Sequence, residues 1–172
     1  MPHRAFTLLE LLAVLAIIGA LAGLMLGVGS HVFTRAKRTR AEGELATLAA
    51  ALETYRRRHG DYPCTADAAA LLQALLGRRD PLNRPITAPA VIDLAHFAPT
   101  AGTDPQADPA ARLVDPWGNP YDYAYRTLDP WENSGYILQS AGPDGVIYHA
   151  LLPGGFIAIA HPDNADNVIA PR

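Results

Sequence analysis

The N-terminal part of the chain is dominated by one uninterrupted apolar run. Residues 11–30 carry no charged side chain. About 20 apolar residues in a helix, at a rise of ~1.5 Å each, span a hydrocarbon core of ~30 Å. The pattern therefore predicts a membrane-spanning helix over residues 6–34, preceded by a short polar segment at residues 1–5.

The apolar positions change from a continuous run to a helical stripe after residue 40. They recur at spacings of three and four, which predicts one buried face of a soluble helix, at Leu45, Leu48, Ala49, Leu52 and Tyr55. The sequence Arg56-Arg57-Arg58 suits the negative end of a helix dipole, and Gly60 can terminate the helix. We therefore expect one long helix from Phe6 to about Arg58.

Turn-forming residues then divide the chain into shorter elements. Thr65 can cap a second helix, Ala66–Leu76, which Gly77 would end. Residues 78–114 are rich in Pro, Ala and Asp without a sustained period, which predicts a long loop. One short element is expected within it, at Val91–Phe97.

Alternating apolar and polar residues return near the C-terminus. The turn-rich stretch Asp115–Tyr121 precedes two expected antiparallel strands, Tyr121–Arg126 and Tyr136–Ser140. A third strand is expected in either Val146–Leu151 or Phe156–Ile159. The predicted fold class is α+β, with a long N-terminal helix packed on a small antiparallel sheet.

Charge is unevenly divided between the two halves of the chain. Residues 1–59 hold eight Lys or Arg and four Glu, whereas residues 60–172 hold six Arg and thirteen Asp or Glu. The acidic half argues against nucleic-acid binding, which needs clustered cations. Cys64 is the only cysteine, so the chain cannot form an intrachain disulfide.

A single carboxylate, Glu10, stands at the head of the apolar run. Ionisable groups in such positions are functional by default because burying them in lipid is unfavourable. The basic leader Met1–Ala5, followed by Phe6-Thr-Leu-Leu-Glu10, resembles the signal of type IV prepilins and pseudopilins, with Ala in place of the usual Gly before the cut. The resemblance implies cleavage between Ala5 and Phe6 by a prepilin peptidase and methylation of the new Phe6 amine. It also implies that Glu10 pairs with the N-terminus of a neighbouring subunit.

Two other interpretations of the N-terminus remain open. An ordinary secretory signal would place its cleavage site after a shorter apolar core. A plain membrane anchor would need no processing, and the positive-inside rule supports it, because Arg35, Lys37, Arg38 and Arg40 follow the apolar run. The prepilin interpretation requires the opposite topology, with the C-terminal domain in the periplasm.

Three glycines, Gly19, Gly23 and Gly27, recur every four residues within the apolar run. Such spacing lets membrane helices approach closely. We interpret them as assembly positions, although small residues are also common in membrane helices generally.

A second resemblance lies in the C-terminal half. Asp115-Pro-Trp-Gly-Asn-Pro-Tyr121, followed by Gly135–Gly145, resembles the major pseudopilin of type II secretion systems. In that family a Ser-x-Gly-x-Asp-Gly turn and a following acidic loop hold one calcium ion. The turn corresponds to Ser140–Gly145 and the loop to 163–167.

The resemblance implies a calcium site made by Asp144, Asp163 and Asp166 with backbone carbonyls near Leu138 and Ser140. Calcium prefers six to eight such oxygen ligands. The chain departs from the family by about ten inserted residues at 148–161, which leaves open whether the loop still reaches the turn.

Other interpretations of these residues also stay open. Asp-Gly and Asp-Asn are ordinary turn formers, and a zinc site at His149, His161 and Asp163 lacks a tight ligand spacing. The sequence contains no catalytic motif of the familiar hydrolase, metalloprotease or phosphate-loop types, so we expect no enzyme. Trp117 is expected to be a buried structural anchor.

Together, the resemblances imply a structural subunit of a type II secretion pseudopilus. Its expected partners are other copies of itself, minor pseudopilins, the prepilin peptidase, the inner-membrane assembly platform and membrane lipid before assembly. The expected location is a single-pass inner-membrane protein with a periplasmic domain at 35–172. The alternatives are a type IV pilin and an anchored binding domain that never polymerises.

Overall fold

A computed structural model describes residues 8–171, except for the side chains of residues 22–32. The longest element is helix α1, Leu8–His59, which matches the single long helix expected from the sequence. The chain forms two compact units, Met1–Ala36 and Lys37–Arg172. Within residues 8–21 and 33–171, no helix holds an apolar window long enough to cross a membrane.

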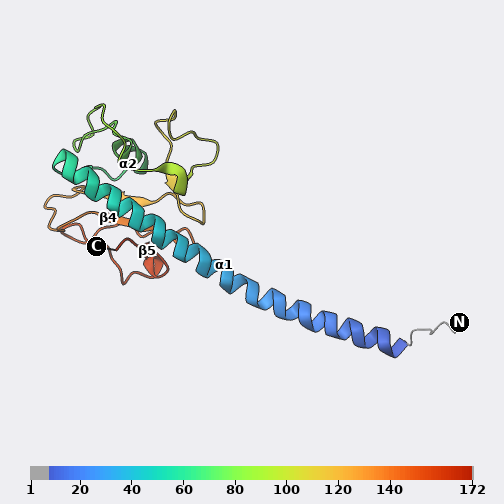
Figure 1. The fold of residues 1–172 in the computed structure, drawn as a ribbon. Helices are drawn as coiled ribbons and strands as arrows, with labels where there is room; N and C mark the ends of the chain where they lie inside the picture. The colour runs from blue at the N-terminus through green and yellow to red at the C-terminus, as the bar shows by residue number, and fades with distance from the viewer. Residues whose placement is uncertain (1–7, 172) are drawn as a thin grey trace. The chain divides into compact units, whose positions relative to one another are not determined.

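The second unit is built around the C-terminal part of α1, with helix α2 and strands β4 and β5 gathered about it (Figure 1). Four of the five residues of the predicted helical stripe are buried, namely Leu45, Leu48, Leu52 and Tyr55, whereas Ala49 is only partly covered. The helix ends as expected: Gly60 adopts a φ of 89°, and its N–H donates to the Arg56 carbonyl at 2.7 Å.

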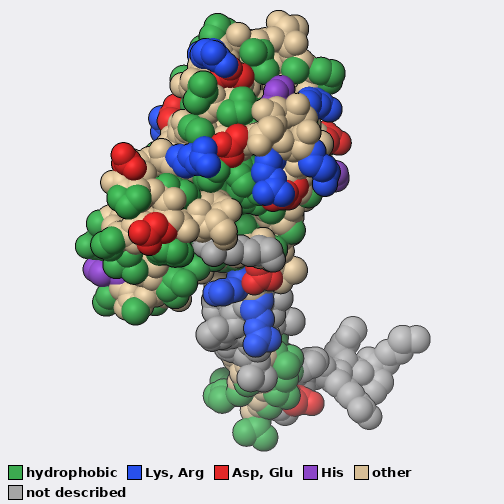
Figure 2. All heavy atoms as spheres, turned by 90° about the vertical axis from the view of Figure 1, so that its left-hand side faces the viewer, with side chains coloured by type: hydrophobic (Ala, Val, Ile, Leu, Met, Phe, Trp, Pro, Cys, Tyr) green, Lys and Arg blue, Asp and Glu red, His purple; other side chains and the backbone are tan. Residues whose placement is uncertain are grey.

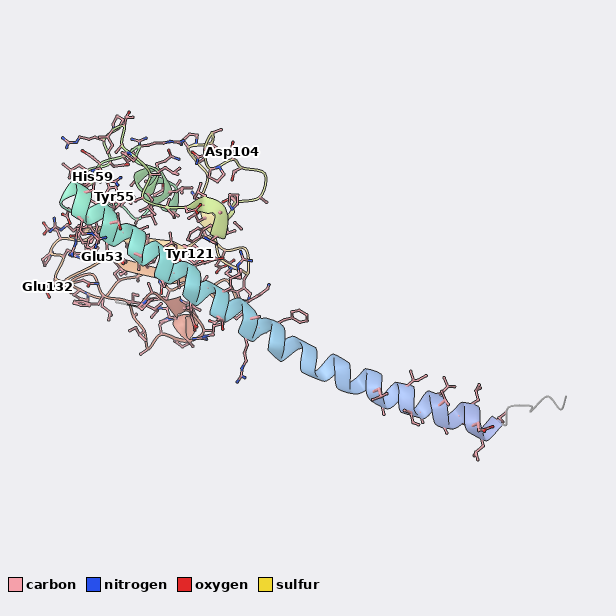
Figure 3. The ribbon with its side chains drawn as sticks, in the orientation of Figure 1. Glu53, Tyr55, His59, Asp104, Tyr121 and Glu132 are labelled. Atoms are coloured by element: carbon pink, nitrogen blue, oxygen red, sulfur yellow. The ribbon has the colours of Figure 1, made fainter. Side chains whose placement is uncertain are left out.

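A buried polar cluster fixes α1 against the rest of this unit. The Tyr121 hydroxyl donates to Glu44 Oε2 at 2.5 Å, and Arg40 Nε donates to Glu44 Oε1 at 2.7 Å. Glu44 is only 5% exposed, so hydrogen bonds from both donors are needed to stabilise its buried carboxylate. Burial and the neighbouring Glu44 carboxylate raise the pKa of Tyr121 far above its usual range. Figure 3 shows Tyr121 beside the C-terminal half of α1.

Helix α2 spans Ala68–Leu75 and begins two residues later than predicted. The expected cap at Thr65 is wrong, because Asp67 is the N-cap and its carboxylate accepts from the N–H groups of Ala69 and Ala70. The Thr65 hydroxyl instead accepts from the Asp67 N–H, which orients the capping residue. The predicted stop at Gly77 is confirmed by its φ of 77°.

The main sheet contains β3 (Asp122–Ala124), β4 (Ile137–Ser140) and β5 (Val168–Ile169), all antiparallel, with β4 in the centre. The two expected strands at 121–126 and 136–140 are confirmed by the pairing of Tyr123 with Leu138.

Both alternatives for the third strand are wrong. Residues 146–151 form no strand, and the segment at Phe156 pairs with Leu152 in a tight turn. This turn packs against residues 132 and 133 instead of joining the sheet, because the N–H groups of Glu132 and Asn133 both donate to the Gly154 carbonyl. The free edge of β4 is therefore paired by the C-terminal β5.

The expected loop at 78–114 contains more structure than its composition predicts. A 3-10 helix, η1 (Leu94–His96), falls within the short element expected at 91–97. Two short strands, β1 (Ala98–Pro99) and β2 (Leu113–Val114), then pair antiparallel in a separate sheet. Trp117, expected to be buried, is only partly covered. Near the C-terminus, a second 3-10 helix, η2, spans Pro162–Asn164.

Candidate functional site

The predicted processing site, Ala5 and Phe6, lies outside the residues that the structure describes, and the surroundings of Gly23 and Gly27 are not described either. Glu10 is exposed in the first turn of α1. Gly19 is also exposed, and a Cβ added there would contact nothing within 4 Å. The assembly roles of these positions therefore stay predictions.

The large apolar side chains at residues 8–21 are open to solvent. Each is at least 49% exposed: Leu8, Leu9, Leu11, Leu12, Val14, Leu15, Ile17, Ile18 and Leu21. A contiguous apolar surface of this kind marks a membrane or protein contact. Glu10 lies at the N-terminal end of this surface.

The candidate cation site lies where β4 ends. Ser140 is fully buried, and its hydroxyl donates to Asp115 Oδ2 at 2.5 Å while accepting from the Gly142 N–H at 3.1 Å. The other oxygen of Asp115 accepts from the N–H groups of Trp117 and Asn119. Asp115, which is 3% exposed, thus fastens the Asp-Pro-Trp-Gly-Asn turn to the end of β4.

The turn at 140–145 and the acidic loop at 163–167 meet despite the insertion between them. Gly142 adopts a φ of 69°, and a Cβ there would stand 2.7 Å from the Asp166 carbonyl oxygen. The Asp144 N–H donates to Asp166 Oδ2 at 3.4 Å. Asp144 Oδ1 in turn accepts from the Val146 N–H at 2.9 Å. The backbone of Asp144 and the side chain of Asp166 are therefore in contact.

Asn167 joins the acidic loop to the turn at this contact. Its side chain is 7% exposed. Its amide nitrogen donates to the Ala141 carbonyl at 3.1 Å and to the Val146 carbonyl at 3.3 Å. The amide therefore supplies donors to two carbonyls of the turn region.

The neighbouring Asn164 amide has partners at both ends. Its Oδ1 accepts from the Tyr148 N–H at 2.9 Å and its Nδ2 donates to the Ala158 carbonyl at 3.0 Å.

The other predicted cation ligands lie in different surroundings. The Leu138 carbonyl accepts from the Ala170 N–H at the edge of the sheet. The Ser140 hydroxyl is committed to Asp115. Asp163, expected to be a main ligand, has its carboxylate 3.7 Å from His161 Nδ1.

The residues of the zinc alternative take separate partners. His149 Nδ1 lies 3.8 Å from Asp122, whereas the His161 ring stacks on Tyr148 with centroids 3.8 Å apart. Within the described part of the chain, no three His, Cys, Asp or Glu side chains gather as a metal cluster.

Sequence reasoning misses Asn164, Asn167 and Asp115. The first two lie in Asp-Asn-Ala-Asp-Asn, where the carboxylates are the stronger signal for calcium because they carry charge. The sequence around Asp115 indicates only a turn. Its hydrogen bond with Ser140 joins residues 25 positions apart, so local sequence patterns cannot predict it.

The N-terminus is similar to a known family. Residues 1–26 match the family model described as the prokaryotic N-terminal methylation motif. This match covers the predicted cleavage site and Glu10.

Most of the chain is also similar to proteins named type II secretion system core protein G. The protein from Pseudomonas aeruginosa is 32% identical over 144 residues, which cover 83% of this chain and 85% of that relative. The protein from Escherichia coli K12 is 32% identical over 143 residues, covering 83% of each chain. The protein from Klebsiella pneumoniae is 32% identical over 145 residues, covering 84% of this chain and 87% of that relative. No solved structure matches the chain significantly.

Proposed function

Because the chain belongs to the family of type II secretion system core protein G, we propose that it polymerises through its N-terminal apolar helix to drive protein export. It is a structural subunit of the pseudopilus. Its partners are copies of itself, minor pseudopilins, the prepilin peptidase and the inner-membrane assembly platform. Its working location is the inner membrane, with the 35–172 domain in the periplasm.

The observation that carries this function is the exposed apolar surface of α1 with a single carboxylate at its start. Removal of residues 1–5 creates an amine at Phe6, four residues before Glu10. In a fibre, the apolar side chains of neighbouring helices cover one another. A carboxylate in that environment needs a cation, and the Phe6 amine of an adjacent copy supplies one.

Intact N-terminal mass, with and without a prepilin peptidase, tests the first step. We expect a chain that begins at methylated Phe6 only when the peptidase is present. A chain that still begins at Met1 would reject the fibre-subunit function.

Substitution of the carboxylate tests the second step. Glu10→Gln keeps the size of the side chain but removes its charge, so we expect normal processing and loss of filaments in electron micrographs. Glu42→Gln is the matched control, because Glu42 is an exposed glutamate on the same helix whose Arg38 partner is also exposed. Filaments of normal abundance from Glu10→Gln would contradict the proposed pairing.

We also propose that the turn at 140–145 and the loop at 163–167 hold a calcium ion. The proposal is supported by the close approach of turn and loop, where the Asp144 N–H donates to Asp166 Oδ2 at 3.4 Å and a Cβ on Gly142 would lie 2.7 Å from the Asp166 carbonyl oxygen. Carboxylate and carbonyl oxygens suit calcium better than zinc.

Calorimetric titration with calcium tests the site. We expect Asp166→Asn to weaken binding at least tenfold, because it removes the carboxylate nearest the turn. Asp104→Asn should leave binding unchanged, because Asp104 lies on another part of the unit (Figure 3). Equal calcium binding by the two variants, or none by the unmodified chain, would reject the proposal.

A further inference from the structure

The part of α1 between the apolar run and the folded domain is short and basic. Residues 11–34 contain no Asp, Glu, Lys or Arg. At a rise of ~1.5 Å per residue they extend ~36 Å, enough to cross a hydrocarbon core of ~30 Å. The first buried residue of the second unit is Ala41, which is 0% exposed. Four of the six residues at 35–40 are cations, and we call these four the basic collar: Arg35, Lys37, Arg38 and Arg40.

The domain leaves the basic collar uncovered, because all four of its residues are exposed. Acidic side chains of the described residues pair with only two of them. Arg40 Nε lies 2.7 Å from Glu44 Oε1, and Arg38 Nε lies 3.4 Å from Glu42 Oε1. The Arg38 and Glu42 side chains are 53% and 55% exposed, so their attraction is weak and screened. Three cations of the collar are therefore available to another partner.

The basic collar surrounds the helix instead of lining one face. Successive residues of an α-helix are ~100° apart around its axis. Measured from Arg35, the other three cations therefore lie at ~140°, ~200° and ~300°. A helix face that packs on a protein is a stripe on the order of 100° wide. Lipid headgroups surround a membrane helix on every side, so they match this distribution better than a protein surface does.

The depth of the basic collar matches the headgroup layer of a bilayer. Arg35 and Arg40 are ~7.5 Å apart along the axis at ~1.5 Å per residue. The layer between the hydrocarbon core and water is ~5–8 Å thick on each side. Phe33, which is 73% exposed, precedes the first cation on the hydrocarbon side. Phosphate oxygens accept paired hydrogen bonds from a guanidinium group and attract the ammonium group of Lys37 as a point charge.

We infer that the basic collar binds the phosphate groups of anionic phospholipids in the leaflet beside the domain. The inference rests on the proposed membrane location and adds a lipid partner of stated chemistry to it. It gives a role to cations that the positive-inside rule would place on the cytoplasmic side. Until a copy joins the fibre, these headgroup contacts hold its domain at the membrane surface.

Tryptophan quenching by brominated lipids tests the inference, in bilayers that contain the full-length Phe33→Trp chain. The signal of Trp117 and Trp131, measured on the unmodified chain, is subtracted. We expect brominated phosphatidylglycerol to bind beside position 33 about fivefold more tightly than brominated phosphatidylcholine, which is the preference that one cation near an anionic surface confers.

Two paired substitutions, made in the Phe33→Trp chain, separate the collar from the charge of the whole protein. Arg35→Gln/Lys37→Gln removes two exposed cations of the collar and should abolish the preference for phosphatidylglycerol. Arg57→Gln/Arg58→Gln is the matched control, because it removes two exposed cations from the last turn of the same helix. Lys and Arg side chains also gather at that end of the second unit (Figure 2). The control should leave the preference unchanged.

The outcomes distinguish the lipid contact from the function on which it rests. Equal quenching by the two lipids in the Phe33→Trp chain would overturn the inference. A preference that survives Arg35→Gln/Lys37→Gln, or that the control also removes, would overturn it as well. N-terminal processing and filament formation test the proposed function separately, because they depend on Phe6 and Glu10. A chain that is processed and polymerises without a lipid preference would keep the function and lose the lipid contact.

Discussion

Replacement of Gly142 by alanine measures how tightly the turn closes on the acidic loop. Gly142 adopts a φ of 69°, and a Cβ added there would lie 2.7 Å from the Asp166 carbonyl oxygen and 3.0 Å from Asp166 Oδ2. Two penalties therefore act together. A left-handed backbone conformation costs a non-glycine residue ~1–2 kcal/mol. Forcing atoms into a packed contact costs a further ~1–3 kcal/mol.

Gly102 provides a matched control for the first penalty. Its φ is 77°, yet a Cβ there would meet nothing within 4 Å. Gly102→Ala should therefore lower the free energy of unfolding by ~1–2 kcal/mol, and Gly142→Ala by ~2–5 kcal/mol. The difference between the variants isolates the contact with Asp166.

The assay is denaturant unfolding of the full-length chain in detergent, followed by tryptophan fluorescence. Trp117 is a suitable reporter, because its backbone N–H is bound to the Asp115 carboxylate that also holds Ser140. Equal destabilisation by Gly142→Ala and Gly102→Ala would refute the close approach of turn and loop. A calcium affinity unchanged in Gly142→Ala would separately refute the placement of the ion at that contact.

Three further predictions concern the core and its tyrosines. Leu52→Ala should lower the free energy of unfolding by ~2–5 kcal/mol because Leu52 is fully buried, whereas Leu82→Ala, at a side chain 65% exposed, should change it by less than ~0.5 kcal/mol. Tyr121→Phe should cost ~1–3 kcal/mol in the same assay, because a buried carboxylate loses a donor; an unchanged midpoint would contradict that bond. Burial raises the pKa of Tyr125 and Tyr136 to about 12 from the usual 10.0. Since the folded pKa exceeds the unfolded one, their stabilisation is complete below pH 10 and is lost as pH rises towards 12; phenolate absorbance that titrates near pH 10 in the folded chain would contradict this.

The long helix is predictable because its signals are local and repeated. The spacing of Leu45, Leu52 and Tyr55 fixes a face over several turns, and Gly60 marks the end. The second helix shows where local signals become ambiguous. Thr65 and Asp67 are both residue types that cap helices well, and in the fold the Thr65 hydroxyl accepts from the Asp67 N–H while Asp67 caps the helix.

The third strand and the cation contact depend on distant parts of the chain. Val168–Ile169 is too short to be predicted from alternation, and it pairs because β4 has a free edge. Asn167 gains its role only when Ala141 and Val146 are brought to it across the insertion. The family resemblance points to the turn and the loop, but it cannot supply the amide contacts between them.

The shortness of the outer strands has a consequence for a subunit packed at high density along a fibre. The three-stranded sheet ends in β3 and β5, which contain three and two residues. Long open edges recruit strands from neighbouring molecules and join domains into cross-β aggregates. Edges this short leave little backbone for such joining, so neighbouring domains can be crowded together and still separate when the fibre is taken apart.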